Sequence, residues 1–111
     1  MNKLDAQSVI EELEAEINNG GLDQYFTNSA GDRAHQAVRA LRAVRAEHTA
    51  TIIERAIAKF PNALVPGERD LRLDILEDLS PHGDLFAAED AAFLEYRDDL
   101  AGLVAAYLER T

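Results

Sequence analysis

The chain has 111 residues, no cysteine and no tryptophan, and 21 acidic against 11 basic side chains give it a formal net charge of −10. This length supports one small domain, and a hydrophobic share of 47% argues against intrinsic disorder. The missing cysteines exclude disulfides, thiolate metal sites and thiol nucleophiles. No apolar run approaches the roughly 20 residues that cross a bilayer, and residues 1–5 lack the start of a signal peptide, so we expect a cytoplasmic protein.

The charges are distributed unevenly along the chain. Residues 1–32 carry 7 acidic and 1 basic side chains, residues 33–60 carry 2 and 6, and residues 61–111 carry 12 and 4. A basic middle between acidic flanks predicts modest ionic attraction within the domain. The overall charge disfavours direct binding to nucleic acid or to an anionic membrane. It indicates binding of cations or basic proteins, or simple solubility, and solvated helix faces are the simpler interpretation.

Hydrophobic periodicity predicts helices and no strand. The first helix is expected over residues 5–18, with one apolar face made of Ala6, Val9, Ile10, Leu13 and Ile17. A short aromatic segment at residues 22–26 follows, and further helices are expected over residues 33–45, 47–60 and 68–79. The last of these is predicted to turn Leu71, Ile75 and Leu79 inward. A final helix over residues 88–110, kinked near Tyr96 or Asp98, completes the expected fold, an all-α single compact domain of about five to six helices over residues 1–111.

The sequence contains no recognisable catalytic or metal-binding pattern. No two of the three histidines stand three or four residues apart, and no glycine-rich phosphate loop or nucleophile elbow is present. We therefore predict no catalytic residues, no metal, no cofactor and no enzymatic activity.

Two acidic stripes are better ordered than solvation requires. One comprises Asp5, Glu12 and Glu16, at one edge of the apolar face of the first helix, and the other comprises Asp70, Asp74, Glu77 and Asp78. Like charges four residues apart disfavour a helix by a few tenths of a kcal/mol, and they lie about 5–6 Å from each other. That spacing is close to the spacing of successive phosphates on a nucleic-acid strand. We therefore predict Glu12, Glu16 and the four carboxylates of the second stripe as partner-binding residues.

The most distinctive run is Glu16-Ile17-Asn18-Asn19-Gly20-Gly21-Leu22-Asp23-Gln24-Tyr25-Phe26-Thr27-Asn28-Ser29-Ala30-Gly31. A mainly structural role is expected for its residues. Asn18 and Asn19 can bind the last carbonyls of the first helix, and Gly20 and Gly21 allow positive φ in a tight reversal. The remaining roles are core packing by Tyr25 and Phe26 and satisfaction of backbone groups by Gln24, Asn28 and Ser29. The functional alternative is a polar ligand pocket formed by Asn18, Asn19, Gln24 and Asn28.

This run resembles the signature of a family of small helical domains that includes a bacterial DNA-mimic protein. The family pattern is Glu-(Val/Ile)-Asn-Asn-Gly-Gly-Phe-x-Gln-(Tyr/Phe)-Phe-x-Asn-Ser-x-Gly, and the chain departs from it mainly at Leu22. Residues 93–100 resemble the start of the family's closing helix. The resemblance implies an all-α domain and, for at least one relative, sequestration of a DNA-binding transcription factor by an acidic surface.

Three functions follow from these observations. The leading hypothesis is a non-enzymatic domain whose acidic helices bind a basic or DNA-binding protein as a DNA mimic, and so regulate transcription. The first alternative is an immunity or antitoxin protein that neutralises a toxin through similar surfaces. The second is a small enzyme or ligand-binding domain that uses the polar pocket. The sequence indicates no particular oligomeric state.

Overall fold

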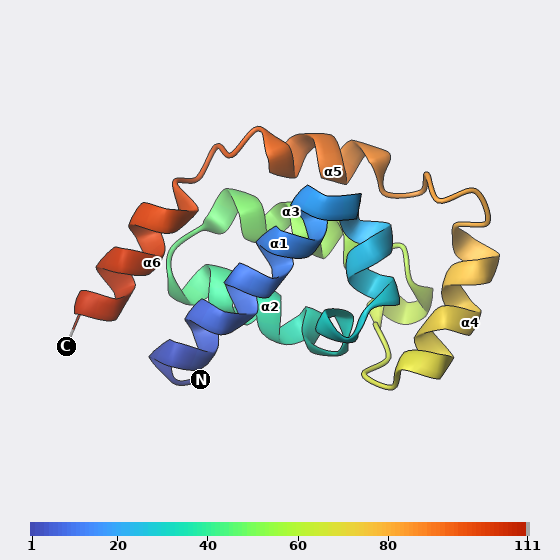
Figure 1. Cartoon of the computed structure of the whole chain (residues 1–111), viewed down its shortest axis with the longest axis horizontal. Helices are drawn as coiled ribbons and strands as arrows, with labels where there is room; N and C mark the ends of the chain where they lie inside the picture. Colours follow the sequence, from blue (N-terminus) through green and yellow to red (C-terminus); the bar gives the residue numbers. More distant parts are fainter. Residues whose placement is uncertain (111) are drawn as a thin grey trace.

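The computed structural model describes residues 1–110, which form helices and no strand (Figure 1). The prediction of an all-α domain with five to six helices is therefore confirmed. The elements are α1 (Lys3–Thr27), η1 (Ser29–Arg33), α2 (Ala34–Ala43), α3 (Glu47–Ile57), η2 (Pro61–Ala63), α4 (Arg69–Leu79), α5 (Ala87–Leu94) and α6 (Leu100–Glu109), where η marks a 3-10 helix. Helix α1 lies at the centre and contacts α2, α4, α5 and α6, while α3 packs on α2 and α5.

The inner face of α1 forms the middle of the core. All five of its predicted apolar positions are buried, namely Ala6, Val9, Ile10, Leu13 and Ile17. At the far end of the helix, Phe26 packs its ring 4.9 Å from Phe60 and 5.1 Å from Phe86, measured between ring centroids. Aromatic pairs at such separations stabilise a core beyond the area that they bury. This cluster joins the end of α1 to the segments that follow α3 and precede α5, and it confirms the core role predicted for Phe26.

Helix α4 is rotated relative to the sequence prediction. Leu71, expected to point inward, is 56% exposed, whereas Arg72 and Leu76 are buried. Ile75 and Leu79 pack only at the edge of the core. The apolar periodicity is misleading here because the helix turns inward a basic side chain that finds carbonyl partners, described below.

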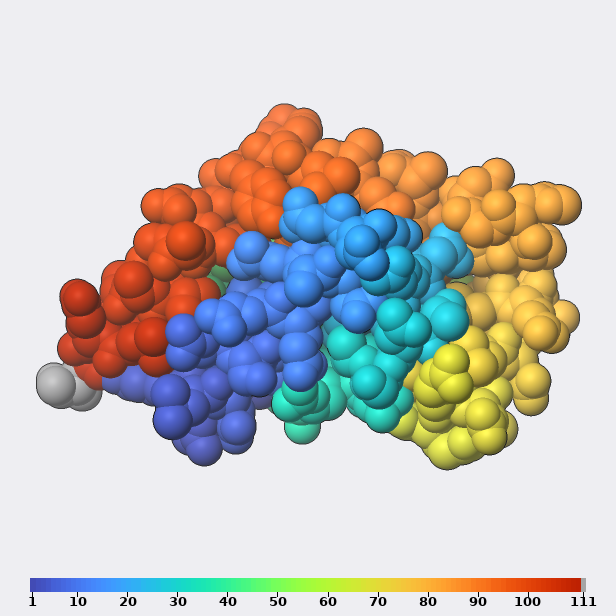
Figure 2. All heavy atoms as spheres, viewed as in Figure 1, coloured from blue at the N-terminus to red at the C-terminus, as the bar shows by residue number. Residues whose placement is uncertain are grey.

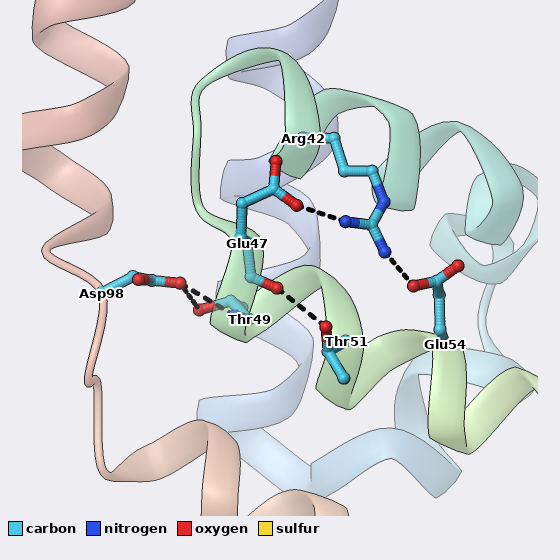
Figure 3. A network of polar contacts seen from close by, with 6 residues as sticks. All are labelled: Arg42, Glu47, Thr49, Thr51, Glu54 and Asp98. Atoms are coloured by element: carbon cyan, nitrogen blue, oxygen red, sulfur yellow. Dashed lines mark hydrogen bonds and ion pairs between the residues drawn. The ribbon is translucent and has the colours of Figure 1, made fainter.

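The predicted C-terminal helix is interrupted where the sequence placed a kink. Helices α5 and α6 are separated by residues 95–99, in which Tyr96 adopts a left-handed conformation with φ of 49°. Within this linker, Asp98 accepts hydrogen bonds from the backbone N–H and the hydroxyl of Thr49, both at 2.8 Å (Figure 3). Ala46, the residue before α3, has no side chain that could cap the helix. Asp98 therefore supplies the missing cap from the linker.

The basic middle segment forms ion pairs with both flanks, as its charge predicted. Arg33 pairs with Glu12 of α1, and Lys59 pairs with Glu89 of α5. Arg42 lies between Glu47 and Glu54 and pairs with both, so it ties α2 to α3 (Figure 3).

Candidate functional site

The glycine pair of the motif produces a bend inside α1. Gly21 leaves the helical region with φ of 80° and ψ of −175°, and the chain then continues as a helix to Thr27. The backbone N–H of Leu22 donates to Asp90 Oδ1 of α5 at 2.8 Å. A Cβ on Gly21 would lie 2.6 Å from Asp90 Oδ2, so glycine is required here by its backbone and by its neighbour. Burial raises the pKa of Asp90, although the bond from Leu22 opposes this shift.

Gly20 does not take the positive φ that we predicted for it. It remains within α1, and only Gly21 is non-helical. A Cβ on Gly20 would lie 2.1 Å from Oε1 of Gln24, which is the end of a flexible side chain. One left-handed residue is sufficient for the bend, so the motif uses its two glycines differently.

The polar side chains of the motif divide between two networks. Gln24 and Asn28 each donate a side-chain N–H to Glu16 Oε2, both at 2.9 Å. Asn18 instead donates to the carbonyl of Glu14 and to the Tyr96 hydroxyl, both at 2.8 Å. The structure thus brings Gln24 and Asn28 together and places Asn18 elsewhere. The bond from Asn18 to a carbonyl of its own helix agrees with its predicted structural role.

Ser29 and Asn19, the remaining polar residues of the motif, are both exposed. Ser29 opens η1 and lines a shallow hollow together with Glu12, Glu16 and Arg33. Asn19 lies on the outer side of α1, before the bend. Of the four side chains of the hypothetical ligand pocket, Gln24 and Asn28 share Glu16 as a partner, while Asn18 bonds to Glu14 and Tyr96 and Asn19 is exposed.

Arg72 of α4 connects the end of the motif to the rest of the fold, and its side chain is fully buried. Its guanidinium donates to the carbonyls of Phe26 at 2.6 Å, Asn28 at 2.9 Å and Pro66 at 2.9 Å. It also forms an ion pair with Asp32 at 2.8 Å. A buried cation is tolerated only when it is paired and hydrogen-bonded, and Arg72 meets both conditions.

Gly31 allows η1 to approach this arginine. A Cβ on Gly31 would lie 2.6 Å from the carbonyl oxygen of Tyr25 and 3.1 Å from Nε of Arg72. Tyr25 itself is 1% exposed, and burial raises the pKa of its hydroxyl, so the phenol stays protonated. Sequence reasoning missed Arg72, although its position four residues before Leu76 places the two on one helix face.

The predicted partner-binding carboxylates on α1 are engaged within the protein. Glu12 pairs with Arg33, and Glu16 accepts from the two motif amides. Both side chains are only half-exposed. These contacts give Glu12 and Glu16 structural partners of their own.

The four predicted carboxylates on α4 lie in a different environment. Asp70, Asp74, Glu77 and Asp78 are all exposed, and none pairs with a basic side chain of residues 1–110. One of them, Glu77, also lines a hollow of about 360 Å³ between the end of α1 and α4. Its lining residues are Asp23, Thr27, Leu73, Leu76, Glu77, Ser80 and Pro81. Figure 2 shows the cyan surface of the motif meeting the yellow and gold surface that includes α4.

Comparison with protein families assigns the chain. The model of the family described as DMP19-like protein, named after DNA mimic protein 19, matches residues 8–111. The chain belongs to this family. The match includes the motif, the bend, Arg72 and the α4 carboxylates, and it confirms the resemblance inferred from the sequence. No curated protein and no solved structure matches the chain.

The described part of this DMP19-like chain was also searched for metal-binding groups and for membrane-spanning helices. Residues 1–110 contain no group of three or more side chains placed to hold a metal ion. Within the same residues, no helix combines the length and the apolar character needed to cross a membrane.

Proposed function

We propose that the chain is a non-enzymatic interaction domain that binds a basic, DNA-binding protein through the outer face of α4, in the manner of a DNA strand. The observation that carries the proposal is the set of four exposed α4 carboxylates that have no basic partner among residues 1–110. Membership of the DMP19-like family supports it, because that family is named after a DNA mimic. Transcription factors of a bacterial cytoplasm are the class of partner that this surface fits.

The geometry of α4 suits such a partner. Carboxylates at positions 70, 74, 77 and 78 recur at each helical turn, about 5–6 Å apart, as phosphates recur along a nucleic-acid strand. A basic surface built to contact phosphates would meet charges of similar spacing, and binding would weaken as salt increases. The proposal keeps these four residues as the site and gives Glu12 and Glu16 a structural role instead.

The test is capture of partners from the native cell, followed by competition with DNA. The wild-type protein should retain a basic DNA-binding protein at low salt and displace DNA from it. The double variant Asp70→Lys plus Asp74→Lys should lose both activities. The control variant Asp5→Lys plus Glu109→Lys changes the net charge equally, at exposed sites outside α4, and should keep both.

Two results would overturn the proposal. One is unchanged DNA displacement by the α4 variant, and the other is the capture of no basic protein at low salt. Capture of a toxin that the chain inhibits would replace it with the immunity-protein alternative, since such a partner would use the same carboxylates.

A further inference from the structure

A groove between α6 and the first half of α1 forms a second surface, which the proposed function does not use. Lys3 lies 5.6 Å from the ring centroid of Tyr107, and Asn18 binds Tyr96 just before α6, so the two helices run antiparallel. Between them lies a groove of about 320 Å³. Its lining residues are Gln7, Ile10, Glu11, Glu14, Leu100, Ala101, Val104, Ala105 and Leu108. It is at the opposite end of the long axis from α4 (Figure 1).

The floor and one wall of this groove are apolar. Leu100–Glu109 contains no charged residue before Glu109, yet only Leu100 and Val104 of this helix are buried. Ala101 and Ala105 are exposed along the wall, where their small side chains allow another backbone to come close. In helical bundles, a third helix commonly packs into such a groove between two antiparallel helices.

The other wall carries uncompensated negative charge. Glu11 and Glu14 lie one turn apart on α1, and no basic side chain of the described residues 1–110 lines the groove. Burial and the neighbouring Glu11 raise the pKa of Glu14, while a hydrogen bond from the Tyr96 hydroxyl opposes the shift. A cation at this wall would stabilise both carboxylates.

We propose that the α1–α6 groove binds an amphipathic helix of a partner protein, with its apolar side chains against Ala101, Ala105 and Leu108 and a lysine or arginine beside Glu11 and Glu14. Apolar side chains at positions i, i+3, i+4 and i+7 of the partner helix would form the apolar face that fits such a groove. A second copy of the chain fits poorly, because it would bring a net charge of −10 to a wall that is already acidic. The proposal is independent of the α4 face.

The test uses amphipathic helical peptides of leucine, alanine and lysine as probes. One peptide carries leucines on a single face with lysines beside them, and the other is a scrambled peptide of the same composition. In titrations followed by NMR, the first peptide should shift the backbone amide resonances of α1 and α6, and the scrambled peptide should not. Ala105→Trp fills the groove from an exposed position and should weaken binding about tenfold or more. Ala106→Trp, which is exposed on α6 but does not line the groove, should bind as wild type.

Further variants test whether the acidic wall of the groove is needed for binding and whether the peptide binds elsewhere. Glu11→Lys plus Glu14→Lys should weaken peptide binding, while Asp70→Lys plus Asp74→Lys, on α4, should leave it unchanged. Equal binding of the scrambled peptide, shifts centred on α4, or equal loss in both tryptophan variants would overturn the proposal. A dimer in sedimentation that Ala105→Trp dissociates would also overturn it, because the occupant would then be a second copy. Circular dichroism on each variant ensures that a loss of binding is not a loss of helix.

Discussion

Glu12 and Glu16 of α1 and the four carboxylates of α4 have the same chemistry but opposite surroundings. On α1, Glu12 pairs with Arg33 and Glu16 accepts from two amides, so these charges stabilise a bend and a turn. On α4, the carboxylates face solvent without basic partners among residues 1–110. The difference teaches that acidic spacing along a helix does not identify a binding surface. A carboxylate without an internal partner is the better indicator.

The largest effect is expected at Arg72, the basic residue of α4 that faces inward. Arg72→Met should lower the free energy of unfolding by about 3 kcal/mol, because it leaves three carbonyl groups without their donor and removes the partner of Asp32. Urea denaturation measures the change.

Arg69 provides the matched control for that experiment. It lies one turn earlier on α4 and donates to the carbonyl of Thr27 at 2.8 Å, but its side chain is exposed. Arg69→Met should cost less than about 1 kcal/mol. Equal losses in the two variants would show that burial does not distinguish the inner and outer faces of α4.

The next largest effect separates the two glycines of the motif. Gly21→Ala should destabilise the protein by about 1–3 kcal/mol, since alanine is strained at φ of 80° and its Cβ would approach Asp90. Gly20→Ala should have a smaller effect, because Gln24 can move aside and alanine favours a helix by about 1 kcal/mol over glycine. Thermal unfolding of both variants tests this order. A larger loss of stability in the Gly20 variant would contradict the assignment of the strain to Gly21.

A third experiment compares the acidic groups directly. Glu16→Ala removes the acceptor for Gln24 and Asn28 and should lower stability by about 1–2 kcal/mol. Glu16→Gln keeps one oxygen acceptor and should give an intermediate value. The same substitution on α4, Glu77→Ala, should change stability by no more than about 0.5 kcal/mol. Chemical denaturation of all three variants measures the difference, and similar losses at both sites would remove the distinction between the two surfaces.

The sequence was most informative where periodicity and short-range geometry determine structure. The apolar face of α1, the burial of Tyr25 and Phe26 and the break near Tyr96 follow from spacing and local chemistry. The rotation of α4 and the role of Arg72 do not, because they depend on carbonyl groups more than forty residues away at Phe26 and Asn28.

The same limit explains the candidate site. Spacing alone placed Glu16 and Asp74 in one class, since both follow a helical stripe. Only the three-dimensional position of Gln24 and Asn28 shows that Glu16 has partners. Likewise, the groove between α1 and α6 combines residues about ninety positions apart, which no local pattern brings together.

The smallest expected effect is also the most direct test of the open α4 face. Asp74 has like charges four residues away on both sides, at Asp70 and Asp78, and no basic partner among residues 1–110. Asp74→Asn should therefore raise the free energy of unfolding by a few tenths of a kcal/mol at low salt, by removing repulsion at nearly equal helix propensity. Added salt should remove most of this gain, because exposed charges are screened. Urea titrations at low and high salt measure the change. A loss of stability on substitution would mean that Asp74 has an internal partner, and α4 would then resemble α1.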